Sequence, residues 1–173
     1  MVGNALAAGL LMASLLSGCF EPSGGTVVNG RMTIRTAATD HPIVKLRSER
    51  RVIVAVTMTN YRRQPVFMVL CGTTEPAFQL EKRVGDEWQL AFQPVCPMIF
   101  SAPRRVESGA TVRHLASIAV TPGGSPRLSP DEMPGRYRMV YGFLSAAGGR
   151  SPGSSEGLLP LSERTSNEFA IVE

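Results

Sequence analysis

Short segments in which apolar and polar residues alternate constrain the fold of this chain more than any other feature. Residues 52–60 are the clearest case, because Val52, Val54, Val56 and Met58 would share one face while Thr57 and Thr59 lie on the other. Successive side chains of a strand point to opposite sides, so this alternation predicts one buried and one exposed face. Alternation or a short apolar run recurs in seven other segments: 32–36, 66–71, 78–81, 88–93, 111–120, 136–143 and 169–172.

Turn-forming residues separate these segments at regular intervals. They lie at 61–65, 84–87, 108–109 and 133–135, and the chain holds 17 glycines and 13 prolines. Strands punctuated in this way are typical of an antiparallel β-sandwich. Two stretches, 121–134 and 145–167, break the pattern and are predicted to be loops, the second of them mobile. We therefore expect one all-β domain of about seven to nine strands over residues 31–173 and no convincing amphipathic helix.

The N-terminal residues have a different character. Residues 4–17 carry no charge and are dominated by alanine, leucine and methionine. Their number suits the apolar core of a secretory signal and falls short of the about 20 residues that a membrane-spanning helix needs. The chain as a whole has the composition and length of a single globular domain, since 43% of its 173 residues are hydrophobic and no other apolar run is long.

A cysteine closes this apolar run. Leu16-Ser17-Gly18-Cys19 resembles the lipobox of bacterial lipoproteins. The resemblance implies that residues 1–18 are a signal peptide, that cleavage occurs before Cys19, and that its sulfur carries diacylglycerol. Two or three acyl chains such as palmitate would anchor the protein stably, whereas one chain holds only marginally. The chain departs from that family in having no Lys or Arg before the apolar run.

The residues after the lipobox predict a tether and a location. Residues 19–30 are rich in glycine, serine and proline and are expected to form a lipidated flexible tether. Lipoproteins retained at the inner membrane usually have Asp after the lipidated cysteine, and Phe20 stands there instead. The resemblance therefore implies the cell envelope and, in an organism with two membranes, the outer membrane facing the periplasm.

Two further cysteines form an even pair once Cys19 is acylated. Cys71 and Cys96 would meet an oxidising compartment after export, which favours a disulfide between them. The alternatives are a metal site or a redox pair. There is no Cys-x-x-Cys motif, and the only histidines, His41 and His114, are isolated, whereas a zinc site needs about four clustered ligands.

The order of turn and packing motifs carries a second resemblance. Its markers are Thr59-Asn60, Gly85-Asp86-Glu87-Trp88, Pro134-Gly135-Arg136-Tyr137 and Ser166-Asn167-Glu168-Phe169. They resemble uncharacterised bacterial envelope lipoproteins with an immunoglobulin-like sandwich and, more weakly, proteinase-inhibitor domains of the BsuPI type. Tyr137 is a candidate tyrosine corner, whose hydroxyl would bond to nearby backbone.

No convincing catalytic motif or cofactor motif is found. The formal Gly-x-Ser-x-Gly at 149–153 has Pro152 after the serine, which removes the N–H that an oxyanion hole requires. His41 and His114 have no motif partner and are interpreted as structural or surface residues. Methionines 58, 68, 98 and 139 are interpreted as core residues. We expect a protein that is not an enzyme and uses no cofactor or metal.

Basic residues suggest one candidate surface. The formal net charge is +4, and four dibasic pairs lie beside strand ends or loops: 50–51, 62–63, 82–83 and 104–105. Arginine pairs well with phosphate or carboxylate, so an anionic lipid or acidic envelope polymer is a candidate partner, with Arg62 and Arg63 the best place for it. The other interpretation is that these charges protect strand ends from pairing. Nucleic acid is not expected in this compartment.

These observations predict a lipid-anchored envelope protein with a non-catalytic β-sandwich in a binding or structural role. Its partners would be the membrane, through the lipid, and an envelope protein or anionic polymer. The alternative is a BsuPI-type proteinase inhibitor that presents residues 145–167 to a protease. That loop is rich in glycine and serine, whereas tight inhibition favours a preorganised loop.

Overall fold

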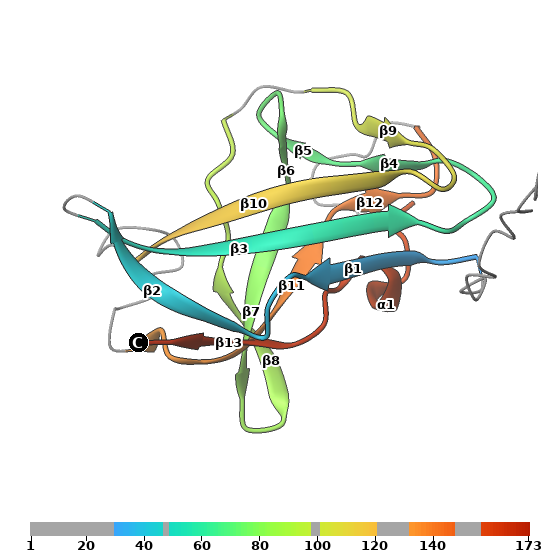
Figure 1. Ribbon diagram of the computed structural model, residues 1–173. Coiled ribbons are helices and arrows are strands. Elements are labelled where there is room, and N and C mark those ends of the chain that lie inside the picture. Colours follow the sequence, from blue (N-terminus) through green and yellow to red (C-terminus); the bar gives the residue numbers. More distant parts are fainter. Residues whose placement is uncertain (1–29, 47–48, 98–100, 121–131, 148–156) are drawn as a thin grey trace, which may run out of the picture.

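The computed structural model describes residues 30–46, 49–97, 101–120, 132–147 and 157–173 (Figure 1). It is mostly β, with several sheets of mainly antiparallel strands, as the alternation predicts. The strands are β1 (Met32–Thr36), β2 (Asp40–Leu46), β3 (Glu49–Asn60), β4 (Val66–Met68), β5 (Leu70–Cys71), β6 (Glu75–Pro76), β7 (Phe78–Val84), β8 (Glu87–Phe92), β9 (Arg104–Val106), β10 (Thr111–Val120), β11 (Gly135–Tyr141), β12 (Phe143–Leu144) and β13 (Phe169–Val172).

The largest sheet is organised around β3. Its strand order is β1-β3-β2-β13-β11-β7-β8, and β10 pairs with β3 from the other side. β10 runs antiparallel along β3 from Thr111 opposite Thr59 to Val120 opposite Arg50. β1 pairs only with the second half of β3 and β2 with the first half. One pairing, between β2 and β13, is parallel.

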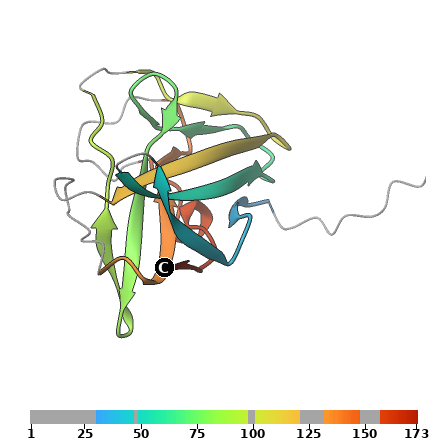
Figure 2. The ribbon, with the colours of Figure 1, turned by 60° about the vertical axis from the view of Figure 1, so that its left-hand side comes forward.

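The hydrophobic core lies on the predicted buried faces. In β3, Val52, Val54, Val56 and Met58 are each at most 2% exposed. The stripe of β11 contributes Tyr137, Met139 and Tyr141 to the same core cluster. Figure 2 shows β3 and β10 crossing β7 and β11, with the smaller β12-β4-β9 sheet nearby. Burial follows the period-two pattern through β3, whereas in β11 Val140 is buried as well as its neighbours Met139 and Tyr141.

Two predicted strands are interrupted. The segment 66–71 breaks at Val69, and 136–143 breaks at Gly142. The two breaks face each other, since the Val69 N–H donates to the Gly142 carbonyl at 2.8 Å. A Cβ on Gly142 would lie 2.9 Å from the Val69 Cβ, so glycine allows this close approach. The alternation does not predict β2, β6 and β9. Pro42 lies within β2, and β6 and β9 are only two and three residues long, too short to show a period.

The prediction that residues 145–167 form a loop throughout is wrong for its second half. Residues 157–167 contain a short helix, α1 (Leu161–Arg164), and isolated bridges to β1, β11 and β12. Polar side chains of this segment bond to the backbone of β1, an interaction that local composition does not reveal. Residues 149–153, with the formal serine motif, lie outside the described residues.

Two predicted local contacts are confirmed. Cys71 and Cys96 form a disulfide that joins β5 to the segment after β8. The buried Tyr137 hydroxyl donates to the Met133 carbonyl at 2.6 Å, as expected for a tyrosine that bonds to nearby backbone. Cys19, the predicted signal peptide and nearly all of the predicted tether lie outside the described residues. Within the described part, α1 is far too short to span a membrane.

Candidate anion-binding face

The exposed side of β1, β3 and β10 carries aligned polar residues. The strand registers place Thr33 beside Thr59, and Thr59 beside Thr111. Two residues further along each strand, the registers place Arg35 beside Thr57, and Thr57 beside Arg113. We call these six residues, with Tyr61 just after β3, the threonine–arginine face. The three strands run side by side in Figure 1.

Two arginines flank one threonine on this face. Neighbouring strands are about 5 Å apart, so the Cα atoms of Arg35 and Arg113 are separated by about 10 Å across Thr57. Both side chains are exposed. Neither makes an ion pair with any residue that the structure describes, and these stretches of β1, β3 and β10 contain no Asp or Glu after Glu49. The face is therefore locally cationic and uncompensated.

A hollow lies beside this row. It has a volume of about 250 Å³ and is lined by Thr33, Arg35, Thr57, Thr59 and Tyr61. The hydroxyls of Thr59 and Thr111 are 3.0 Å apart, which fixes one side of it. Hydroxyl and guanidinium groups all donate hydrogen bonds, and such donors bind phosphate, sulfate or carboxylate oxygens well. The arrangement suits an anionic group held against the sheet.

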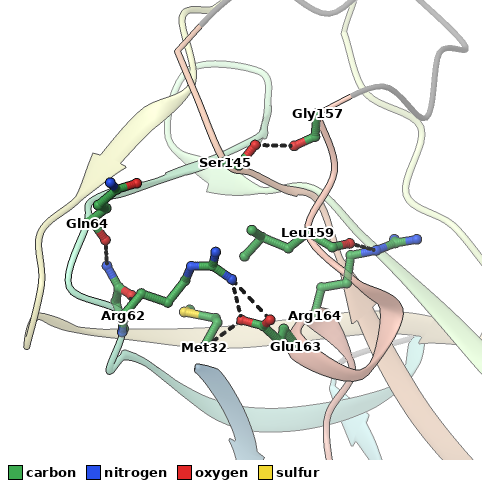
Figure 3. A network of polar contacts seen from close by, with 9 residues as sticks. Met32, Arg62, Gln64, Ser145, Gly157, Leu159, Glu163 and Arg164 are labelled. Carbon is green, nitrogen blue, oxygen red and sulfur yellow. Dashed lines mark hydrogen bonds and ion pairs between the residues drawn. The ribbon is translucent and has the colours of Figure 1, made fainter. Parts of the chain in front are cut away.

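The predicted pair Arg62 and Arg63 is placed differently. The Arg62 Nη1 donates to both carboxylate oxygens of Glu163, at 2.8 and 3.0 Å (Figure 3). Glu163 is 9% exposed, and its Oε2 also accepts a bond from the Met32 N–H at 3.0 Å. Arg62 thus holds α1 against β1, while Arg63 is exposed. An anion at this hairpin would have to compete with Glu163 for Arg62.

The other three dibasic pairs also have members engaged internally. Arg51 pairs with Glu49, Arg83 with Asp86 and Glu168, and Arg105 with Glu107. The Lys82 ammonium donates to the Glu132 carbonyl. In each pair at least one cation is therefore occupied, which leaves fewer free charges than the sequence suggests.

His114 is buried behind the face, between the buried Tyr141 and the exposed Glu75. Its Nε2 lies 3.4 Å from the Glu75 carboxylate, and its Nδ1 lies 2.9 Å from the Tyr141 hydroxyl. Because the carboxylate accepts from Nε2, the neutral ring carries its proton there and accepts from Tyr141 at Nδ1. Burial lowers the pKa of His114, and Glu75 opposes that shift. Burial raises the pKa of Tyr141, so its phenol keeps its proton.

The contacts of His114 serve to fasten strands. Glu75 lies opposite Cys71 in the β5–β6 pair, so the disulfide-linked hairpin is joined to β10 through His114. His41 is also buried, with Nδ1 3.1 Å from the Ile53 carbonyl and its ring edge-on to Phe169. Both histidines therefore lie inside the fold. The described residues bring no three His, Cys, Asp or Glu side chains together as metal ligands.

Sequence reasoning missed Arg35 and Arg113 because neither belongs to a dibasic pair. A signal was available in Thr33-Ile34-Arg35 and Thr111-Val112-Arg113, where arginine follows threonine on the exposed phase of a strand. What the sequence could not supply is the register that aligns both arginines with Thr57.

Comparison with known proteins does not assign this site a function. No known family matches the chain, and no similar curated protein was found.

Proposed function

We propose that this chain is a lipid-anchored cell-envelope protein whose domain binds an anionic ligand without catalysing a reaction. The observation that carries the proposal is the row Arg35–Thr57–Arg113, two exposed guanidiniums without an acidic partner in the described structure on either side of a hydroxyl. Binding fits this site better than catalysis, because its groups donate hydrogen bonds and none of them is a nucleophile or base at neutral pH.

The finer fold assignment is part of this proposal. We infer an immunoglobulin-like β-sandwich, supported by the mainly antiparallel sheets and by the Tyr137 bond to the Met133 carbonyl. The parallel β2–β13 pair and the three strand partners of β3 are variations on this architecture.

The lipid anchor rests on Leu16-Ser17-Gly18-Cys19. Export and acylation at Cys19 place the domain at the cell envelope, on the outer membrane facing the periplasm where two membranes exist. Mass spectrometry of the purified protein should find acyl groups on an N-terminal Cys19. A Cys19→Ser variant should accumulate uncleaved and without lipid, and an unmodified Cys19 in the wild type would contradict the anchor.

An anionic partner is favoured over a protease. Half of the proposed inhibitory segment 145–167 is tied down, since Glu163 and Asn167 bond to the backbone of β1. Arg35 and Arg113 face outward by contrast, and charges on the threonine–arginine face would attract phosphate- or carboxylate-bearing polymers. The proteinase inhibitor therefore stays the weaker alternative.

The test is a binding titration of the acylated protein in a neutral detergent. Polyphosphate and polyglutamate are the probes, and neutral dextran is the blank. Replacing Arg35 or Arg113 by glutamine should weaken binding of the polyanions about five- to tenfold, because each loses a charge-assisted hydrogen bond. Binding should also weaken steeply as salt rises.

Matched variants separate the site from net charge. Arg104→Gln removes the same charge from an exposed position on β9 and should change affinity little. Arg63→Gln tests the hairpin instead. Equal losses in all four variants would show that only net charge matters, and loss confined to Arg63→Gln would place the anion at the hairpin; either result overturns the proposed face.

A further inference from the structure

β10 leaves one edge without a strand partner in the described part of the chain, where it pairs only with β3. The Asn60 N–H donates to the Ala110 carbonyl, which fixes which residues of β10 face β3. Bonding alternates along an antiparallel ladder, so the even-numbered residues 112–118 bond inward. The N–H and C=O groups of Arg113, Leu115 and Ser117 therefore point to the open edge.

The side chains at that edge combine a charge and an apolar group. The same odd-numbered residues lie on the exposed side of the sheet, and Leu115 is 70% exposed. Ile53, on the neighbouring strand and diagonal to Leu115, is 39% exposed. Arg113 lies two residues before Leu115 and belongs to the threonine–arginine face. An open strand edge with these side chains is the usual template for strand addition.

We propose that β10 binds an extended polypeptide segment of a partner protein, added antiparallel to its open edge. The segment would place an acidic side chain opposite Arg113 and an apolar side chain opposite Leu115. Read along the antiparallel partner, this is an apolar residue, any residue, then Asp or Glu. The inference rests on the proposed function, since it names a polypeptide carboxylate as the anion that Arg113 receives.

Charge complementarity favours such a partner over a second copy. In a two-fold antiparallel pairing centred on Leu115, Arg113 would lie opposite Ser117 of the other copy. Both guanidiniums would then lack a counter-charge, and two molecules of net charge +4 would repel each other. An acidic strand instead supplies Arg113 with the counter-charge that the described structure does not provide.

A designed peptide tests this directly. The probe is a blocked nine-residue peptide that alternates threonine with valine but has isoleucine at position four and glutamate at position six. Its binding to the acylated protein in neutral detergent is followed by fluorescence anisotropy. Exchanging glutamate for lysine should weaken binding about tenfold or more. Arg113→Glu should reverse that preference, which identifies the facing pair.

Backbone pairing has its own matched control. N-methylation of the isoleucine removes the amide that would bond to Leu115 and should abolish binding, whereas N-methylation of the next threonine modifies an amide on the far edge and should leave it. Leu115→Pro removes the outward donor of β10 and should weaken binding about tenfold. If Leu115→Pro is poorly folded, the test rests on Arg113→Glu and on the two methylated peptides, none of which changes the backbone of β10.

The outcomes separate this inference from the proposed function. Equal binding of the two methylated peptides would overturn strand addition, even where Arg35→Gln and Arg113→Gln still weaken polyphosphate binding. A dimer that Leu115→Pro dissociates, together with no peptide binding, would overturn it in favour of self-pairing. If Arg35→Gln and Arg113→Gln bind polyphosphate and polyglutamate as tightly as the wild type does, the proposed function is overturned instead.

Discussion

β1 and β10 pair with opposite sides of β3, and their outer edges differ. On β1, three successive outward-facing positions have partners: the Met32 N–H bonds to Glu163, Ile34 bridges to Ser166, and the Thr36 N–H bonds to Asn167. All three partners lie in a five-residue segment, 163–167, far away in sequence. On β10 the described structure supplies no such partners for Arg113, Leu115 and Ser117.

The difference shows that, among the described residues, a segment covers the outer edge of β1 and none covers that of β10. An open edge is an aggregation hazard unless charge, proline or a covering segment protects it. β1 is protected by a covering segment that is itself held by the Arg62–Glu163 ion pair. Along the open edge of β10 the only protecting charge is Arg113, and Leu115, two residues on, is exposed. That contrast is what a strand-binding site would require.

The largest expected effect tests the orientation of β10. Ala116 is fully buried and its N–H faces β3, so Ala116→Pro should lose an inner ladder bond and crowd the core. We expect a loss of at least about 3 kcal/mol in the free energy of unfolding. Leu115→Pro changes an outward N–H and should cost less than about 1 kcal/mol.

Urea denaturation of both variants measures the contrast. The reverse order of stability would mean that the odd-numbered residues bond to β3, so that Arg113, Leu115 and Ser117 would not face an open edge. Similar midpoints for the two variants would remove the distinction between the inner and outer positions of β10.

A smaller effect is expected from opening β1. Glu163→Ala leaves the buried Met32 N–H and the Arg62 guanidinium without their acceptor and should destabilise by about 2–3 kcal/mol. Glu163→Gln keeps an acceptor and should cost about half as much. The Glu107→Ala control breaks an exposed ion pair with Arg105 and should cost under about 1 kcal/mol.

Hydrogen exchange locates the change. The Met32 amide should lose protection in Glu163→Ala, whereas the amides of β10 should keep theirs. Equal destabilisation by Glu163→Ala and Glu107→Ala would mean that the covering segment contributes no more than a surface charge pair.

The smallest effect is a pH dependence on the β10 side. Because the pKa of His114 is lowered in the folded protein, the unfolded chain takes up this proton first. Stability contributed by neutral His114 is present above pH 6.5 and is lost as pH falls below it toward the folded pKa. Glu75→Gln removes the group that raises this pKa, so the free energy of unfolding should fall further at acid pH in this variant.

Urea denaturation at pH 7.5 and pH 5, with an NMR titration of the His114 ring, checks this sign. Exchange protection in β10 should fall more than protection in β1 at the lower pH. Two results would contradict a lowered pKa of His114. One is a ring that titrates above pH 6.5 in the folded protein, and the other is a Glu75→Gln variant that loses no stability between pH 7.5 and pH 5.

Residue-level patterns in the chain predict much of this fold. The alternation in 52–60 and 111–120 identifies β3 and β10 together with their buried faces, because side-chain direction along a strand is a local property. The even pair Cys71 and Cys96 identifies the disulfide once export is assumed. Tyr137 finds its acceptor, the Met133 carbonyl, only four residues away.

Tertiary structure alone decided which residues became neighbours. Arg62 looked free beside Arg63, but α1 brings Glu163 to it from 101 residues away. Arg35 and Arg113 looked ordinary, but register aligns them across Thr57. Register and long-range pairing depend on how whole strands pack, so a period of two determines which face of a strand is buried and leaves its partner unspecified. The candidate site depends on such a pairing, because only the registers of β1 and β10 with β3 bring its two arginines together.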